Sequence, residues 1–142
     1  MPLIVEKYGG TSVGTAERIH AVADRVMRGH HAGDDLVVVV SAMAGETNRL
    51  LDLARVIDPK ADAREIDVLV STGEQVTIAL LTMALHNRQI EARSYTGGQV
   101  RILTDNVHGK ARILDIDADS VRADICLLYT SDAADERSSV DL

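Results

Sequence analysis

The stretch VEKYGGTSVG, residues 5–14, combines the groups that could do chemistry on a phosphate. Lys7 follows an apolar run, and two glycines come directly after Tyr8. Glycines let backbone N–H groups approach an oxyanion closely, and a helix N-terminus or a lysine adds positive charge. The stretch therefore indicates a phosphate-binding loop. It matches neither a Walker motif nor the dinucleotide fingerprint, so a tight turn with a solvated Lys7 stays open as the alternative.

Three other loops carry polar residues that could serve the same site. Ser41 and Thr47 follow a run of four valines, Glu74 precedes or opens a helical stretch, and residues 96–99 follow another predicted strand. Each side chain also has a structural interpretation. Ser41 can satisfy a strand-end backbone group, Thr47 can cap a helix, and Glu74 can be a first-turn helix acid.

The elements that must position these loops alternate between strands and helices. The valine run at 36–40 is typical of a strand buried on both faces. Apolar residues recur at helical spacing between Thr15 and Gly29. The other predicted elements are strands over 3–5, 90–95, 100–103 and 111–116 and helices over 47–56 and 64–87. This order predicts an α/β fold with a mainly parallel sheet, whose ligands bind at the carboxyl ends of the strands.

The helix predicted over 64–87 is the longest, and its apolar residues are expected to point inward. Gly73 lies inside it and costs about 1 kcal/mol relative to alanine in a helix interior. The helix could therefore begin near Glu74 instead. The residues predicted to face the core are Leu69, Val76, Leu80 and Met83.

Composition indicates one water-soluble domain in the cytoplasm. The chain has 142 residues, of which 46% are hydrophobic and 26% charged. The longest apolar run, 36–40, is too short to span a bilayer, and no signal-peptide layout precedes it. The net charge of -7 argues against nucleic-acid partners. Cys126 is the only cysteine, and no cysteine or histidine cluster has metal-ligand spacing, so no metal site is predicted.

The last stretch, residues 126–142, differs in character from the rest. Residues 126–135 resemble the translation of a transposon mosaic end joined to a library adapter. A genuine polar, disordered C-terminus is the alternative. We therefore expect a domain over 1–125 and an artefactual disordered tail over 126–142.

Four segments together resemble the N-terminal part of the catalytic domain of bacterial aspartate kinases, in the amino acid kinase superfamily. They are VEKYGGTSVG, VVVVSAMAGETNRLLDLA, DVLVSTGEQVTIALL and ARSYTGGQVRILTDNVHGKARI. The resemblance implies a three-layer αβα sandwich of the carbamate kinase-like type. It also implies ATP-dependent phosphorylation of the β-carboxylate of L-aspartate to 4-phospho-L-aspartate, the first step towards lysine, threonine and methionine.

The resemblance also implies roles for individual residues. Lys7 and Ser41 match catalytic positions, and Glu74 matches the acid that receives the substrate ammonium group. A transferring phosphoryl group is stabilised by such fixed cations and hydrogen-bond donors. The segment assigned to the ATP phosphates contains Lys7, Tyr8, Gly9 and Gly10. The aspartate-binding positions are Ser41, Thr47, Asn48, Arg49 and Glu74.

The family continues beyond the last matching segment, and its second half is absent from this sequence. We expect that half to hold Mg²⁺, together with the substrate phosphates, and the full-length protein to be a homo-oligomer. The 142-residue chain should be inactive alone, and its uncovered sheet should promote self-association. Two alternatives remain: a non-enzymatic truncated chimera with residual amino-acid binding, or another member of the superfamily with a different acceptor.

Overall fold

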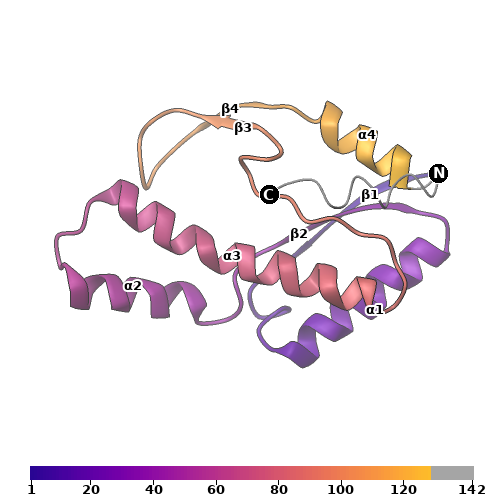
Figure 1. The fold of residues 1–142 in the computed structure, drawn as a ribbon, viewed down its shortest axis with the longest axis horizontal. Coiled ribbons are helices and arrows are strands. Elements are labelled where there is room, and N and C mark those ends of the chain that lie inside the picture. Colours follow the sequence, from indigo (N-terminus) through magenta and orange to yellow (C-terminus); the bar gives the residue numbers. More distant parts are fainter. Residues whose placement is uncertain (129–142) are drawn as a thin grey trace. The chain divides into compact units, whose positions relative to one another are not determined.

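The structure is a computed structural model that describes residues 1–128 (Figure 1). The chain divides into two compact units, Met1–Ile90 and one that begins at Glu91. The first unit contains β1 (Leu3–Tyr8), α1 (Ala16–His31), β2 (Asp35–Val40), α2 (Glu46–Ile57) and α3 (Ala63–His86). The second contains β3 (Ile102–Thr104), β4 (Ile113–Ile116) and α4 (Asp119–Leu128).

The first unit is built on a parallel pair of strands, β1 and β2. The ladder runs from Leu3 opposite Asp35 to Tyr8 opposite Val40. The helix α1 makes the crossover between them, which is the connection that parallel strands require. This arrangement confirms the predicted strand, glycine turn, helix and strand. Both loops that follow the strands therefore begin at the same edge of the sheet.

The helix α1 covers one face of this sheet. Thr15 caps its N-terminus by accepting a hydrogen bond from the backbone N–H of Arg18 at 3.2 Å. A Cβ on Gly29 would lie 3.1 Å from Leu36 Cδ1, so α1 packs closely on the face that carries Leu36. The helix α3 contacts both α1 and β2, and Figure 1 shows the two helices side by side.

The opposite face of the sheet is exposed. Alternation along β1 places Leu3 and Val5 on that face, and the ladder adds Val39 to it. Val5 is 63% exposed and Val39 is 46% exposed. The prediction that the valine strand is buried on both faces is therefore wrong for the described residues. A β-branched run reflects the cover that a strand has in the whole fold, and the elements of the first unit do not supply that cover on this face.

The helix α3 runs through Gly73 without interruption, which rules out a start near Glu74. Its buried residues are also not the predicted ones, since Val76, Leu80 and Met83 are exposed and Leu69 is only partly buried. The buried stripe is Gly73, Thr77, Leu81, Ala84 and Leu85. Small residues in this stripe let α3 approach α1 and α2 closely. The face of α3 that packs is therefore the one with the smaller side chains, and the face that carries Val76, Leu80 and Met83 is exposed.

By length and composition alone, α3 could also cross a membrane. One such helix is weak evidence, because core helices of water-soluble proteins meet the same criterion. In this structure α3 packs against α1 and α2. Arg88, just after the helix, donates to Asp24 of α1 at 2.7 Å.

The second unit is small and mostly irregular. Its strands β3 and β4 pair antiparallel and confirm the extended pieces predicted near 100–103 and 111–116. The strand predicted over 90–95 is absent: that segment is irregular, and Arg93 there binds Asp124 of α4 at 3.2 Å. A strand needs a partner ladder, which local sequence does not reveal. The helix α4 continues through Leu128, three residues into the predicted tail, and 129–142 lie outside the described residues.

Candidate functional site

A cavity of about 340 Å³ lies in the first unit, where the loops after β1 and β2 meet α2 and α3. This is the carboxyl edge of the parallel pair, where ligands collect in such sheets. The cavity brings together five of the predicted site residues, from three segments far apart in sequence. The lining residues are Gly10, Ser41, Ala42, Met43, Ala44, Gly45, Thr47, Asn48 and Glu74.

The loop after β1 is held against the loop after β2 by contacts that only small residues permit. A Cβ on Gly10 would lie 2.9 Å from the carbonyl oxygen of Ala42, which is closer than a real Cβ approaches. A Cβ on Gly14 would lie 3.1 Å from that of Ala44. The backbone N–H of Ser41 donates to the carbonyl oxygen of Tyr8 at 3.2 Å. Glycine at position 10 therefore lets the predicted phosphate loop form one wall of the cavity.

The N-terminus of α2 forms a second wall. Gly45 precedes the helix with φ of 79°, a left-handed conformation that favours glycine, and it provides no side-chain cap. Thr47 lies at the second position of the helix, so its interpretation as the N-cap is wrong. The exposed Thr47 and Asn48 side chains line the cavity beside the helix N-terminus. Such a terminus is suited to a carboxylate or phosphate.

Glu74 supplies a negative charge to the same cavity. It lies in the middle of α3, which begins at Ala63, so it is not a first-turn acid. Its exposed side chain lines the cavity, as does Ser41 at the end of β2. An anionic group from α3 thus faces the same space as the electropositive end of α2. That pairing of charges is complementary to a zwitterion.

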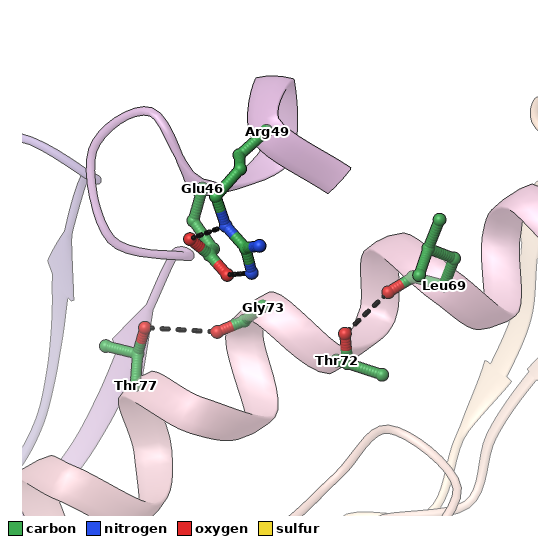
Figure 2. Close-up of polar contacts among 6 residues, drawn as sticks. All are labelled: Glu46, Arg49, Leu69, Thr72, Gly73 and Thr77. Carbon is green, nitrogen blue, oxygen red and sulfur yellow. Dashed lines mark hydrogen bonds and ion pairs between the residues drawn. The ribbon is translucent and has the colours of Figure 1, made fainter. Parts of the chain in front are cut away.

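Arg49 and Glu46 are engaged with each other rather than with the cavity lining. Figure 2 shows two hydrogen bonds between them, from Nε to Oε2 at 3.0 Å and from Nη2 to Oε1 at 2.6 Å. The hydrogen bond from Arg49 lowers the pKa of the Glu46 carboxyl below its ordinary value. The predicted binding residue Arg49 is therefore bound to a neighbour one turn away, although it stays close to the site.

Lys7 and Tyr8 point to opposite faces of the sheet, and neither lines the cavity, nor does Gly9. The Lys7 side chain is on the exposed face. The Tyr8 hydroxyl donates to Glu6 Oε2 at 2.6 Å. The pKa of Tyr8 is raised to about 12, mainly by burial of the hydroxyl and next by this hydrogen bond to Glu6. Of the four predicted phosphate-binding residues, the cavity therefore includes Gly10.

The cavity also contains residues that the sequence did not single out. Gly45 had a detectable signal, because a glycine directly before a helical stretch often adopts a special backbone conformation. Ala42 had none, since its role depends on contacts with Gly10 and Gly73 from distant segments. Local patterns do not report such packing.

Within residues 1–128 no group of three or more His, Cys, Asp or Glu residues could hold a metal ion. Three histidines lie at helix ends, with His30 and His31 in the last turn of α1 and His86 in that of α3. His20 contacts Arg88 at 3.2 Å. These four histidines thus lie at helix ends or on the surface of the first unit.

Residues 2–125 match the amino acid kinase family. Over 125 residues the chain is 66% identical to the aspartate kinase of Pseudomonas putida, and it is 52% identical over 124 residues to aspartokinase 2 of Bacillus subtilis. These matches cover 88% and 87% of this chain but 30% of each relative. The chain therefore spans less than one third of the length of these curated relatives.

Solved structures agree with this relationship. The aspartate kinase of Synechocystis superposes with a TM-score of 0.66 at 58% identity, over 69% of this chain and 17% of that one. E. coli aspartokinase III in complex with lysine and aspartate gives 0.65 at 23% identity, over 95% of this chain and 39% of that one, which shows the fold alone. The α/β class, the kinase-like αβα fold and the resemblance to aspartate kinases are thus confirmed, and the chain belongs to the amino acid kinase family.

Proposed function

We propose that this chain carries the acceptor side and one phosphate loop of an aspartate kinase active site. The observation that carries the proposal is the cavity in which Glu74 and the N-terminus of α2 face the same space. L-Aspartate has one ammonium and two carboxylate groups, and the cavity offers a partner for each kind. Relatives that bear the name aspartate kinase support this choice of amino acid.

In this proposal Glu74 accepts hydrogen bonds from the substrate ammonium group. Thr47, Asn48 and the first-turn N–H groups of α2 bind a carboxylate, and Ser41 donates a hydrogen bond near the reacting oxygen. Arg49 contributes through its charge near this end of α2. Together these groups would orient the β-carboxylate towards the loop after β1.

ATP would bind on the side of the cavity formed by that loop. Gly10 lines the cavity already, and Lys7, Tyr8 and Gly9 precede it in the same segment. Lys7 would supply charge to the transferring phosphoryl group. When bound, Mg²⁺ neutralises phosphate charge, but the described residues offer it no cluster of their own. We assign its retention to the ATP phosphates and to the parts of the longer relatives that this chain does not span.

The wider setting follows from the same proposal. The curated relatives are bacterial enzymes of which this chain spans 30%, so phosphoryl transfer requires the longer protein. We propose a cytoplasmic homo-oligomer for that protein, with L-aspartate and ATP as its small-molecule partners and no nucleic-acid or membrane partner. The 142-residue chain is expected to bind aspartate without forming ADP.

Calorimetric titration of the purified chain with L-aspartate tests this function. We expect saturable binding that Glu74→Gln weakens at least tenfold, since a charge-assisted hydrogen bond contributes about 1.5–3 kcal/mol. Glu65→Gln is the matched control, because Glu65 is an exposed acid on the same helix outside the cavity. Absence of aspartate binding, or equal loss in both variants, would contradict the proposal. L-Glutamate and a coupled ADP assay in parallel would reveal a different acceptor or residual activity.

A further inference from the structure

A junction of small residues joins the phosphate loop to α3 beneath the cavity. Ala42 is at its centre and is only 6% exposed. Gly10 approaches the carbonyl oxygen of Ala42, and Gly73 of α3 approaches its methyl group. Ala42 therefore lies between the loop after β1 and α3, which both border the cavity.

Gly73 is the member of this junction whose side-chain size matters most for α3. A Cβ at position 73 would lie 3.0 Å from the Cβ of Ala42, well inside the roughly 3.5–4.0 Å at which carbon atoms make favourable contact. It would also meet Glu46 Cγ at 3.6 Å and Leu50 Cδ1 at 3.7 Å. Glycine at this position costs helix stability, yet α3 runs straight through it.

The segment around Gly73 is closely packed on the side that faces Ala42 and α2. The Thr77 hydroxyl, one turn further along α3, donates to the Gly73 carbonyl oxygen at 3.3 Å, as Figure 2 shows. Thr77 is fully buried, and Leu50 of α2 is 6% exposed. An added methyl group would therefore push α3 away from the loop as a unit. Glu74, the next residue, would move with it.

We infer that Gly73 is a positioning residue for Glu74. Its missing side chain sets how closely α3 approaches the loop at Ala42, and thereby how far the Glu74 carboxylate stands from the N-terminus of α2. The ligand, L-aspartate, rests on the proposed function. The geometric part of the inference concerns the position of Glu74 alone and can be measured without a ligand.

The test is a cycle of four chains: the parent, Gly73→Ala, Ala42→Gly and the double variant. Ala42→Gly removes the methyl group that the new one would meet, so it should restore the original approach. The amide NMR resonances of Thr47 and Asn48, which line the cavity and are far from position 73 in sequence, report how the N-terminus of α2 lies relative to α3. L-Aspartate titration reports the consequence for binding. Val68→Ala is the matched control, because Val68 lies on the same helix, is 52% exposed and does not line the cavity.

We expect Gly73→Ala to shift these resonances and to weaken aspartate binding roughly three- to tenfold, since displacement by a fraction of an ångström already reduces binding and reactivity. The double variant should return both readouts to those of Ala42→Gly, whereas Val68→Ala should leave them unchanged. Unmoved resonances in Gly73→Ala, or no recovery in the double variant, would overturn the inference.

The cycle separates this inference from the proposed function. If the parent chain does not bind aspartate, the proposed function fails, and the resonances alone decide whether Gly73 positions Glu74. If Gly73→Ala does not fold, recovery of the fold and of the Thr47 and Asn48 resonances in the double variant supports the inference. A double variant that also fails to fold contradicts it, because the clash with Ala42 would then not be the cause.

Discussion

The Tyr8 hydroxyl donates a 2.6 Å hydrogen bond to the carboxylate of Glu6, its neighbour on the same face of β1. Arg25 of α1 lies 3.7 Å from the other oxygen of that carboxylate. Glu6 thus connects the end of β1 to the helix that covers it. Its partner Tyr8 is turned away from the sheet face that carries Lys7.

This relationship predicts a dependence of stability on alkaline pH. The pKa of Tyr8 is raised to about 12 in the folded chain, above the ordinary value of about 10. The folded state therefore binds more protons than the unfolded state between these values, so stability is full below pH 10 and falls towards pH 12. Urea unfolding at pH 9 and pH 11.5 should show this fall, and Tyr8→Phe should reduce it. An equal fall in Tyr8→Phe would contradict the role of Tyr8.

The Glu46–Arg49 pair predicts a second pH effect, at the acidic end. Arg49 lowers the pKa of Glu46, so the stabilisation is present above the ordinary glutamate pKa and is lost as pH falls through the lowered value. Carbon-detected NMR titration should give a pKa for the Glu46 carboxyl below that of an ordinary glutamate. In Arg49→Gln the pKa of Glu46 should return to the ordinary range. Arg55→Gln, which removes the partner of Asp52 on the same helix, should leave the pKa of Glu46 unchanged.

Two adjacent glycines should respond very differently to the same substitution. Gly10→Ala places a Cβ 2.9 Å from the Ala42 carbonyl oxygen, and a crowded backbone contact of this kind costs about 1–3 kcal/mol of unfolding free energy. Gly9→Ala meets nothing within 4 Å. Urea unfolding of both variants measures the difference. Equal losses of unfolding free energy in Gly10→Ala and Gly9→Ala would contradict the importance of the contact between Gly10 and Ala42.

Two arginine–aspartate pairs of equal length should differ in their contribution to stability. Arg88 donates to Asp24 at 2.7 Å and also to the carbonyl oxygens of Ala84 and His20, with its side chain only 16% exposed. Arg55 and Asp52 are also 2.7 Å apart, but they are exposed and one turn apart. Arg88→Ala should cost roughly 1–2 kcal/mol through the lost carbonyl contacts. Arg55→Ala should cost less than about 0.5 kcal/mol in the same urea assay, and equal losses would contradict this ranking.

The exposed face of the parallel sheet should make the chain self-associate. Val5 and Val39 lie on that face and are largely uncovered, and apolar surface of this kind promotes contact between molecules. Val5→Thr with Val39→Thr should lower the average mass measured by light scattering while it preserves strand propensity. Val56→Thr on α2, where Val56 is 81% exposed, is the control. If Val56→Thr lowered the average mass more than the double variant does, the surface that mediates self-association would lie on α2 instead.

Much of the fold of residues 1–57 could be predicted from local patterns. The valine run predicts β2, the periodicity between Thr15 and Gly29 predicts α1, and the glycines after Lys7 predict the turn between β1 and that helix. These features depend on side chains close in sequence. The meeting of Gly10 and Ser41 in one cavity followed from the rule that ligands collect at the carboxyl ends of parallel strands. Glu74 reaches the same cavity from the middle of α3, where that rule does not apply.

The errors concern properties that depend on distant partners. Gly73 suggested a helix break because propensity assigns it a cost, but its contact with Ala42 requires the missing side chain. Met83 and Leu80 suggested an inward face because they are large, although the closely packed face is lined partly by small residues. The segment 90–95 suggested a strand, but strand formation depends on a partner. Local sequence contains none of this information.

The parallel register of β1 and β2 also constrains the order of folding. Leu3 pairs with Asp35, so every hydrogen bond between β1 and β2 requires closure of a loop of about 32 residues, with the cost in chain entropy that such a loop carries. The contact of Gly10 with Ala42 can form only once the strands are aligned, and the contact with Gly73 must recruit a third segment. We therefore expect the cavity to form late in folding, so that Gly10→Ala and Gly73→Ala accelerate unfolding more than they slow refolding in stopped-flow measurements.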